Sequence, residues 1–381
     1  MAGNELSKPP QIDEVEVSLF GPGYGECILL HVGQHNWIIV DSCLNKNKRP
    51  VAIDYLRSIG EDPSKSVQLI VATHWHDDHV GGLGATLREC SSAQFVCSDA
   101  LREEEFRTLV KAMKNRSMMT RSGVKEFNEI MDVLGERKKP QSKVATPKFA
   151  TANRILCSAS DFKSGLPYTC TIQSLSPSDA EIMLAKQVIA GLIPVESKPK
   201  KAIVARRPNQ VAVVLWISVG DLSILLGSDL EETSDPSTGW SVIVDSKGKL
   251  PNGKATVFKV PHHGSKNGHQ PRVWNEMLED EPVAILTPFI NGKTILPEKG
   301  DASRICLQTS IAYSTASTKE RQIKSRSNVV NKTISEAVKS IREVPSATGH
   351  IRLRKNILAG PGIAWKVELF GTALHLRELC A

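Results

Sequence analysis

The chain opens with short apolar segments separated by polar turns, a pattern that predicts β-strands. The first of them, residues 15–20, alternates between apolar and polar side chains, as expected of a strand. Comparable segments occur at 28–32, 37–40, 67–72, 94–97, 155–158, 169–175, 211–219, 222–226, 256–260, 283–286, 350–354 and 364–370. Helical periodicity lies between several of them, most clearly at 50–58, 84–89 and 179–188. Strands that alternate with helices indicate an α/β fold.

Residues 100–150 interrupt this alternation and predict a helical insertion. Apolar residues recur at helical spacing over 103–114 and 123–137, which indicates helix packing rather than a cofactor site. Two further helices are expected near the C-terminus, at 302–314 and 329–341.

The composition is that of a soluble globular protein, with 40% hydrophobic and 23% charged residues in a chain of 381. No apolar run is long enough to span a membrane, and the N-terminus does not resemble a signal peptide, so we expect a cytoplasmic protein without a membrane partner. Eight cysteines without a Cys-x-x-Cys pair indicate reduced thiols. Residues 1–11 include Pro9 and Pro10 and are expected to be disordered.

The formal net charge of +7 is concentrated near the C-terminus. Residues 301–381 carry 13 Lys and Arg against 6 Asp and Glu, whereas the first 300 residues are neutral. A basic region on a neutral body favours a polyanionic partner, although a solvated basic surface without a partner gives the same count.

The strongest chemical signal directly follows the predicted strand 67–72, in the segment Thr73-His74-Trp75-His76-Asp77-Asp78-His79-Val80-Gly81-Gly82. Imidazole and carboxylate groups at alternate positions of a strand end project to the same side and can converge on a metal ion. The segment has five potential ligands within six residues, which is far more than a surface loop contains by chance. It therefore predicts a metal site.

The string His-x-His-x-Asp-His between an apolar strand and Gly-Gly resembles the signature of the metallo-β-lactamase superfamily. The resemblance implies a four-layered αββα sandwich over residues 12–290, with the helical insertion at about 100–150 and a basic C-terminal region, 291–381, that completes the fold or packs on it. It also implies two divalent metal ions, zinc or manganese, with His74 and His76 holding one ion and Asp78 and His79 the other.

Other motifs are similar to one subgroup of that superfamily, the DNA-internalisation competence (ComEC-type) proteins. A glycine-rich turn at 21–27 precedes the second strand, the third strand at 37–40 ends in Asp41, and Val-Pro-His-His-Gly-Ser-Lys occurs at 260–266. The similarity implies that Asp41 orients the histidine segment and that Asp229, at the end of another strand, bridges the ions. It assigns one of His262 and His263 to the second ion, with His263 favoured.

The resemblance also suggests roles beside the metal ligands. Lys266 is expected to contact a phosphate or to neutralise the leaving group. Asp78 or Asp77 is expected to orient the attacking water. Many members of the superfamily have a further histidine before the bridging aspartate, but this chain has none between residues 80 and 261. Asn209 takes that place, and its weaker amide ligand would leave the first ion's site more open or favour manganese over zinc.

Two cations that share a carboxylate activate water near neutral pH and can hydrolyse phosphodiesters, thioesters and lactams alike. The competence-type motifs and the basic region favour a two-metal phosphodiesterase that acts on DNA. The residues expected to contact nucleic acid are Lys200, Lys201, Arg206 and Arg207 in a basic loop, and Arg352 and Arg354 on a C-terminal strand.

Two other functions stay open from the sequence. One is hydrolysis of a small, cyclic nucleotide, for which a closed pocket and insensitivity to salt are expected. The other is a nucleic-acid-binding or protein-binding subunit with an incomplete metal site, in which a protein partner contacts the helical insertion or the C-terminal region. A β-lactamase is disfavoured, because the chain has no export signal and its last motif is of the competence type.

Overall fold

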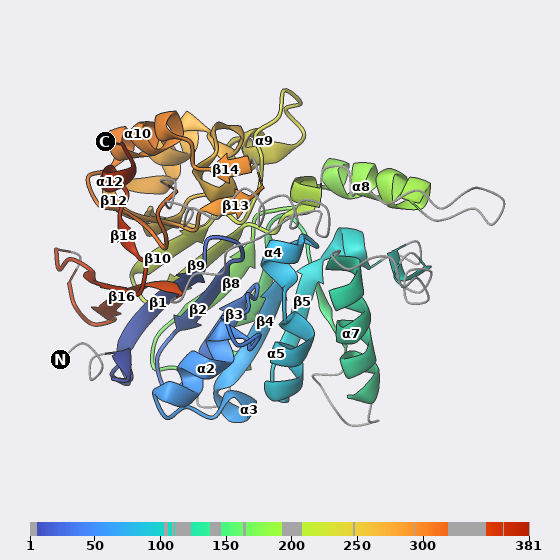
Figure 1. Cartoon of the computed structure of the whole chain (residues 1–381), viewed down its shortest axis with the longest axis horizontal. Coiled ribbons are helices and arrows are strands. Elements are labelled where there is room, and N and C mark those ends of the chain that lie inside the picture. The colour runs from blue at the N-terminus through green and yellow to red at the C-terminus, as the bar shows by residue number, and fades with distance from the viewer. Residues whose placement is uncertain are drawn as a thin grey trace, which may run out of the picture.

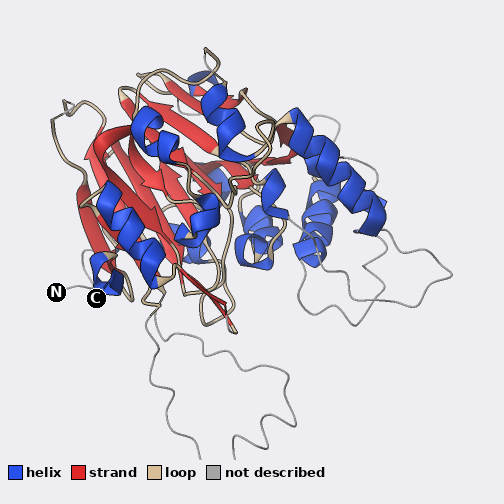
Figure 2. Ribbon diagram, turned by 90° about the horizontal axis from the view of Figure 1, so that it is seen from above, coloured by secondary structure: helices blue, strands red, loops and turns tan. Residues whose placement is uncertain are grey.

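The computed structural model describes residues 6–102, 106–108, 110, 123–137, 146–162, 165–192, 208–246, 248–292, 294–318, 348–360 and 362–380. Within them, two eight-stranded sheets lie face to face, and helices cover the outer side of each sheet (Figures 1 and 2). The predicted α/β sandwich is therefore confirmed, and its four layers are consistent with the metallo-β-lactamase fold. None of the described helices is long and apolar enough to cross a membrane.

The first sheet has the strand order β17-β16-β1-β2-β3-β4-β5-β6. Its strands are β1 (Glu14–Gly21), β2 (Cys27–His31), β3 (Trp37–Val40), β4 (Val67–Ala72), β5 (Gln94–Ser98), β6 (Lys148–Ala150), β16 (Gly349–Asn356) and β17 (Lys366–Phe370). The strands from β3 to β6 run parallel to one another. Parallel strands end at the same edge of a sheet, so the segments that follow β3 and β4 begin side by side.

The second sheet has the order β18-β15-β12-β11-β10-β9-β8-β7. Its strands are β7 (Arg154–Ser158), β8 (Cys170–Ser174), β9 (Leu215–Val219), β10 (Leu222–Leu226), β11 (Ala255–Lys259), β12 (Leu278–Leu286), β15 (Ala312–Ser314) and β18 (Leu374–His375). Here β10, β11, β12 and β15 are parallel, so the segments after β10 and β11 also begin side by side. A separate hairpin comprises β13 (Phe289–Asn291) and β14 (Thr294–Leu296).

The helices pack on the outer faces of the two sheets, and three apolar layers hold the sandwich together. The helices are α2 (Val51–Ser58), α3 (Pro63–Ser66), α4 (Asp77–Val80), α5 (Leu83–Glu89), α7 (Gly123–Glu136), α8 (Asp179–Leu192), α9 (Gly239–Asp245), α10 (Lys299–Gln308) and α12 (Arg377–Cys380). One apolar layer lies between the sheets, one lies under α2, α5 and α7, and one lies under α9 and α10. Strands buried on both faces explain why so many segments are continuously apolar rather than alternating.

The C-terminal region contributes strands to both sheets. β16 pairs with β1 along eight residues, and β15 extends the second sheet beside β12. The predicted helix 302–314 is wrong at its end, because α10 stops at Gln308 and Ala312–Ser314 form the buried strand β15. The predicted helix 329–341 lies outside the described residues.

The prediction that Arg352 and Arg354 contact nucleic acid is wrong. Both side chains are buried on β16, where Arg352 pairs with Glu368 at 2.9 Å and Arg354 pairs with Glu16 at 2.7 Å. Arg352 also donates to the carbonyl of Leu6, and Arg354 to the carbonyl of Lys8. The same contacts place part of the N-terminal segment on the sheet, so the predicted disorder does not hold for residues 6–11.

Candidate metal centre

The centre forms where the ends of parallel strands from the two sheets meet. The chain turns after β4 through His74 and His76 into the short helix α4, which carries Asp78 and His79. It leaves α4 through Gly82, whose φ of +79° is a conformation that favours glycine. The segments after β10 and β11 supply the remaining groups, in agreement with the rule that sites of α/β proteins lie at the carboxyl ends of strands.

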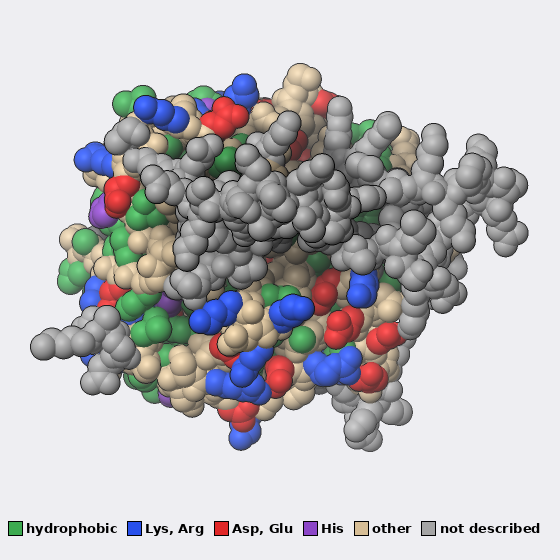
Figure 3. All heavy atoms as spheres, viewed as in Figure 1, with side chains coloured by type: hydrophobic (Ala, Val, Ile, Leu, Met, Phe, Trp, Pro, Cys, Tyr) green, Lys and Arg blue, Asp and Glu red, His purple; other side chains and the backbone are tan. Residues whose placement is uncertain are grey.

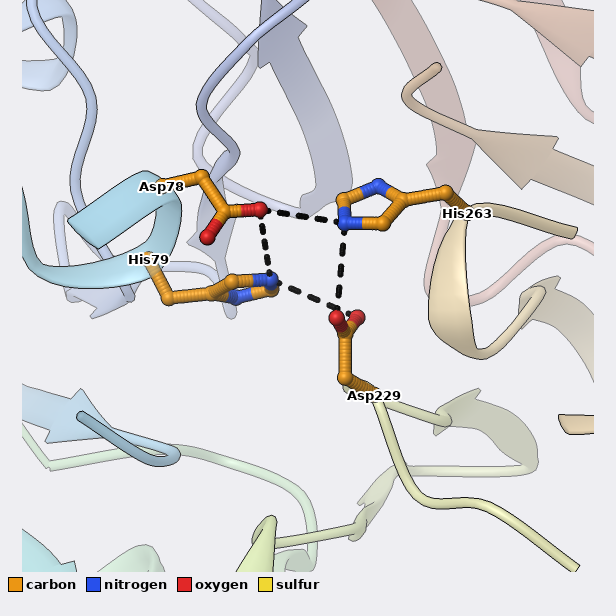
Figure 4. Close-up of side chains that lie close together, drawn as sticks. All are labelled: Asp78, His79, Asp229 and His263. Carbon is orange, nitrogen blue, oxygen red and sulfur yellow. Dashed lines mark hydrogen bonds and ion pairs between the residues drawn. The ribbon is translucent and has the colours of Figure 1, made fainter. Parts of the chain in front are cut away.

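Four buried side chains converge at the base of the centre: Asp78, His79, Asp229 and His263 (Figure 4). Each offers one nitrogen or oxygen, and these atoms lie within 4.8 Å of one another. His263 Nε2 is 3.2 Å from Asp78 Oδ2 and 3.3 Å from Asp229 Oδ2, while His79 Nε2 is 3.3 Å from Asp229 Oδ1. We call these four residues the lower ligand group.

A second set of three residues, His74, His76 and Asp229, meets the same distance limit. His74 Nε2 lies 3.1 Å from His76 Nδ1, so the two imidazoles direct nitrogens at each other. We call this set the upper ligand group. Asp229 belongs to both groups, and its carboxylate therefore lies within reach of every other ligand atom.

Burial and charge act in opposite directions on these residues. Burial alone lowers the pKa of His263, but the carboxylates of Asp229 and Asp78 raise it to about 9. Burial likewise opposes protonation of His79, yet Asp229, Asp41 and Asp78 raise its pKa well above the usual value. Burial lowers the pKa of His74, and the neighbouring His79 and His76 lower it further. The carboxylates of the lower ligand group thus favour positive charge on the imidazoles of His79 and His263.

The donor set fits divalent cations. His79 Nε2 and Asp229 Oδ1 are buried, and neither makes a hydrogen bond of good geometry within the described part of the chain. Buried polar atoms without a good hydrogen bond are costly unless a ligand satisfies them. Imidazole nitrogens and carboxylate oxygens together are ligands for zinc and for other transition metals such as manganese.

Asp41 supports the lower group from behind. At the end of β3 its Oδ2 accepts hydrogen bonds from His79 Nδ1 at 2.7 Å and from Thr73 Oγ1 at 2.7 Å, and its Oδ1 accepts from Thr73 N at 2.8 Å. These bonds leave His79 Nε2 directed at Asp229. A carboxylate that fixes the outer nitrogen of a ligating histidine is a common partner in metal sites.

The adjacent residues His262 and His263 lie in different surroundings. His263 belongs to the lower group, whereas His262 belongs to neither ligand group in the described residues. His262 Nδ1 is 3.4 Å from Glu231 Oε1, and its Nε2 is 3.3 Å from Asn209 Nδ2, which also donates to Glu231 at 3.0 Å. Asn209 Oδ1 is buried without a partner among the described residues, so its predicted role as a weak ligand stays a prediction.

The other predicted site residues lie around these groups or outside the described residues. Lys266 is exposed on the short turn Lys266–Gly268, which Ser265 separates from the His262–Gly264 turn. Asp77 is half-buried at the start of α4. The four basic loop residues Lys200, Lys201, Arg206 and Arg207 lie outside the described part of the chain.

Three buried residues at the centre were not predicted from the sequence: Glu26, Lys259 and Thr287. Lys259 Nζ is 2.8 Å from Glu26 Oε1 and 3.6 Å from Asp229 Oδ1, and Thr287 O accepts from His263 Nδ1 at 3.0 Å. A signal was present at two positions, a charged residue within the apolar strand 256–260 and a glutamate in the glycine-rich turn 21–27.

Part of the chain matches a known protein family. Residues 20–140 match the profile of the Metallo-beta-lactamase superfamily. Similar solved structures include the metallo-beta-lactamase fold protein YhfI from Bacillus subtilis, which is 14% identical over 65% of this chain and 70% of that chain, with a TM-score of 0.33. MEM-A1, a subclass B3 metallo-beta-lactamase isolated from a soil metagenome library, is 13% identical over 70% of this chain and 86% of that chain, also with a TM-score of 0.33.

No curated protein matches the chain. Residues 20–140 therefore resemble the metallo-β-lactamase superfamily, and the two-sheet fold and the ligand groups at the strand ends are consistent with it.

Proposed function

We propose that this protein is a hydrolase that uses two divalent metal ions to cleave phosphodiester bonds, with DNA as the favoured substrate. The observation that carries the proposal is the position of Asp229, which is common to the upper and lower ligand groups. A carboxylate can give one oxygen to each of two cations, and an ion pair of this kind occurs in many phosphatases and nucleases.

Two cations at these groups would activate a water molecule and stabilise the negative oxygens of a phosphodiester under attack. The protein side chains provide the rest. Asp78 has one oxygen at 3.2 Å from His263 Nε2, and we assign its other oxygen to orienting the water. His262, which Glu231 and Asn209 hold beside the groups, can hydrogen-bond to the departing oxygen. Lys266 is exposed beyond it and can contact a phosphate of the substrate or neutralise the charge on the leaving oxygen.

The preference for DNA rests on the resemblance of the sequence motifs to the competence-type proteins and on the charge of the chain. The net charge is +7, and Lys266 belongs to the last motif. With Arg352 and Arg354 buried in ion pairs, the expected phosphate contacts are reduced to Lys266 and the loop cations. On the face seen in Figure 3, the basic and acidic side chains of the described residues are interspersed. DNA binding is therefore expected to be moderate and to weaken with salt.

The test is hydrolysis by the purified protein of labelled single-stranded DNA, double-stranded DNA and a cyclic dinucleotide, with Mn²⁺, Zn²⁺ or Mg²⁺. The same assay is applied to the variants Asp229→Ala and Asp221→Asn. Asp221 is an exposed aspartate at the other end of β10 and serves as the matched control.

We expect metal-dependent DNA cleavage that Asp229→Ala abolishes and Asp221→Asn retains. Cleavage of the cyclic dinucleotide alone would replace DNA by a small nucleotide as the substrate. Absence of both activities in a protein that binds DNA would favour the binding-subunit function. Equal cleavage by the wild type and Asp229→Ala would contradict the proposal.

A further inference from the structure

Lys259 is a fully buried lysine at the base of the metal centre. It is the last residue of β11, and its side chain is 0% exposed. Lysine is almost never fully buried unless its charge is paired, because removal of an ammonium group from water is costly. The groups around Lys259 therefore show which negative charges its ammonium group pairs with.

The ammonium group of Lys259 lies between two carboxylates and a carbonyl. It is 2.8 Å from Glu26 Oε1, it donates to the carbonyl of Ser228 at 2.8 Å, and it is 3.6 Å from Asp229 Oδ1. Ser228 directly precedes Asp229, so Lys259 contacts both the backbone and the side chain of the segment that presents the shared carboxylate.

Glu26 connects this lysine to the other side of the centre. It lies in the turn between β1 and β2, where its backbone N–H donates to the carbonyl of Asp78 at 2.8 Å. Its Oε2 accepts a hydrogen bond from Thr287 Oγ1, and Thr287 in turn accepts from His263 Nδ1 through its carbonyl at 3.0 Å. Glu26 and Lys259 therefore link, across the two sheets, three residues of the lower ligand group.

The turn that carries Glu26 needs glycine to approach so closely. Gly25 has a φ of +112°, and a Cβ at this position would be 2.7 Å from the Cβ of Cys43. A larger residue at this position would push Glu26 away from Lys259. Glycine at position 25 thus allows Glu26 to come close to Lys259, which a simple hairpin turn would not require.

Glu26, Asp41 and His79 form a third buried group with ligand atoms within 4.8 Å of one another, so by composition it could also hold a metal ion. The ammonium group of Lys259 at 2.8 Å from Glu26 already supplies a positive charge there. We propose that Lys259 is a positioning residue of the metal centre, a cation built into the chain that holds Asp229 in the orientation in which both ligand groups share it. The inference rests on the proposed metal-dependent function.

A single substitution does not test this inference cleanly. Lys259→Met leaves Glu26 as a buried unpaired charge, which destabilises the fold whether or not Lys259 positions Asp229. The double variant Glu26→Gln/Lys259→Met removes both charges, and the glutamine oxygen can still accept from Thr287 Oγ1. The matched control is Glu16→Gln/Arg354→Met, which removes another fully buried ion pair on the helix-covered face of the first sheet.

The measurement is the affinity of the metal-free proteins for Mn²⁺ by titration calorimetry, with circular dichroism and thermal unfolding in chelator to verify the fold. We expect the Glu26→Gln/Lys259→Met protein to fold and to bind Mn²⁺ about 10–100-fold more weakly, as is typical when a residue that orients a metal ligand is lost. The Glu16→Gln/Arg354→Met control is expected to bind Mn²⁺ like the wild type.

Two results would overturn the inference. One is a folded Glu26→Gln/Lys259→Met protein with wild-type affinity for Mn²⁺, and the other is an equal loss of affinity in the control. If the wild type itself bound no metal, the proposed function would fail instead, so the two failures are distinguishable.

Discussion

At the scale of single residues, the backbone decides which of two neighbouring histidines enters the ligand groups. His262 and His263 have φ values of +48° and +53°, and these left-handed conformations turn the two side chains in different directions. His263 Nδ1 is held by the carbonyl of Thr287, which directs Nε2 at Asp78 and Asp229. The sequence could not separate the two residues, because their chemistry is identical and only the turn distinguishes them.

The different positions of His262 and His263 predict different effects when each is replaced by alanine. His263→Ala is expected to lose one bound ion and to reduce DNA cleavage by at least about 100-fold, because a ligand contributes more than the 10–100-fold of an outer partner. His262→Ala, a matched change at the next residue, is expected to keep the wild-type metal content. Metal content after dialysis, measured by mass spectrometry, is the readout. A loss of metal in His262→Ala with normal content in His263→Ala would reverse the assignment.

At the scale of elements, the sequence predicted those features that depend on local pattern. Apolar runs located most strands, and the site residues after β3 and β4, like those after β10 and β11, lie near each other because parallel strands end at one edge of a sheet. The pairing of Glu26 with Lys259 could not be predicted, because Glu26 lies in a turn of the first sheet and Lys259 ends a strand of the second. Their proximity depends on how the sheets face each other.

The wrong prediction for Arg352 and Arg354 has a related cause. Alternating arginines on a strand indicate that one face is polar, but not whether that face is exposed. In the structure the face is covered, and Tyr55 of α2, Glu16 and Glu368 provide the polar partners that buried guanidinium groups need. A sequence has no local signal that this face is covered. The cover is provided by α2 and by residues 6–11 of the N-terminal segment.

At the scale of the whole molecule, buried neutral histidines link stability to pH. His31 on β2 is buried beside Trp37, and its Nδ1 lies 2.8 Å from the carbonyl of Glu14. Burial lowers its pKa from the usual 6.5 to about 3. Between pH 6.5 and about pH 3, His31 is protonated in the unfolded chain and neutral in the folded protein. The stability that His31 contributes is therefore present above pH 6.5 and is lost as the pH falls toward 3.

From this shift, the wild type is expected to lose about 2 kcal/mol of unfolding free energy through His31 between pH 7.5 and pH 5.0. His31→Phe removes the titrating group, so its stability should fall by that much less over the same interval. Urea unfolding in the presence of chelator measures both proteins. The control is His375→Gln, at an exposed position on β18, which should follow the wild type. The same pH dependence in His31→Phe and the wild type would contradict the prediction.

The proposed function requires two metal ions that share Asp229. The most direct test is anomalous diffraction from wild-type crystals soaked in Mn²⁺. Two peaks are expected, one beside His74 and His76 and one beside Asp78, His79 and His263, with the Asp229 carboxylate between them. A single peak, or none at either ligand group, would contradict it.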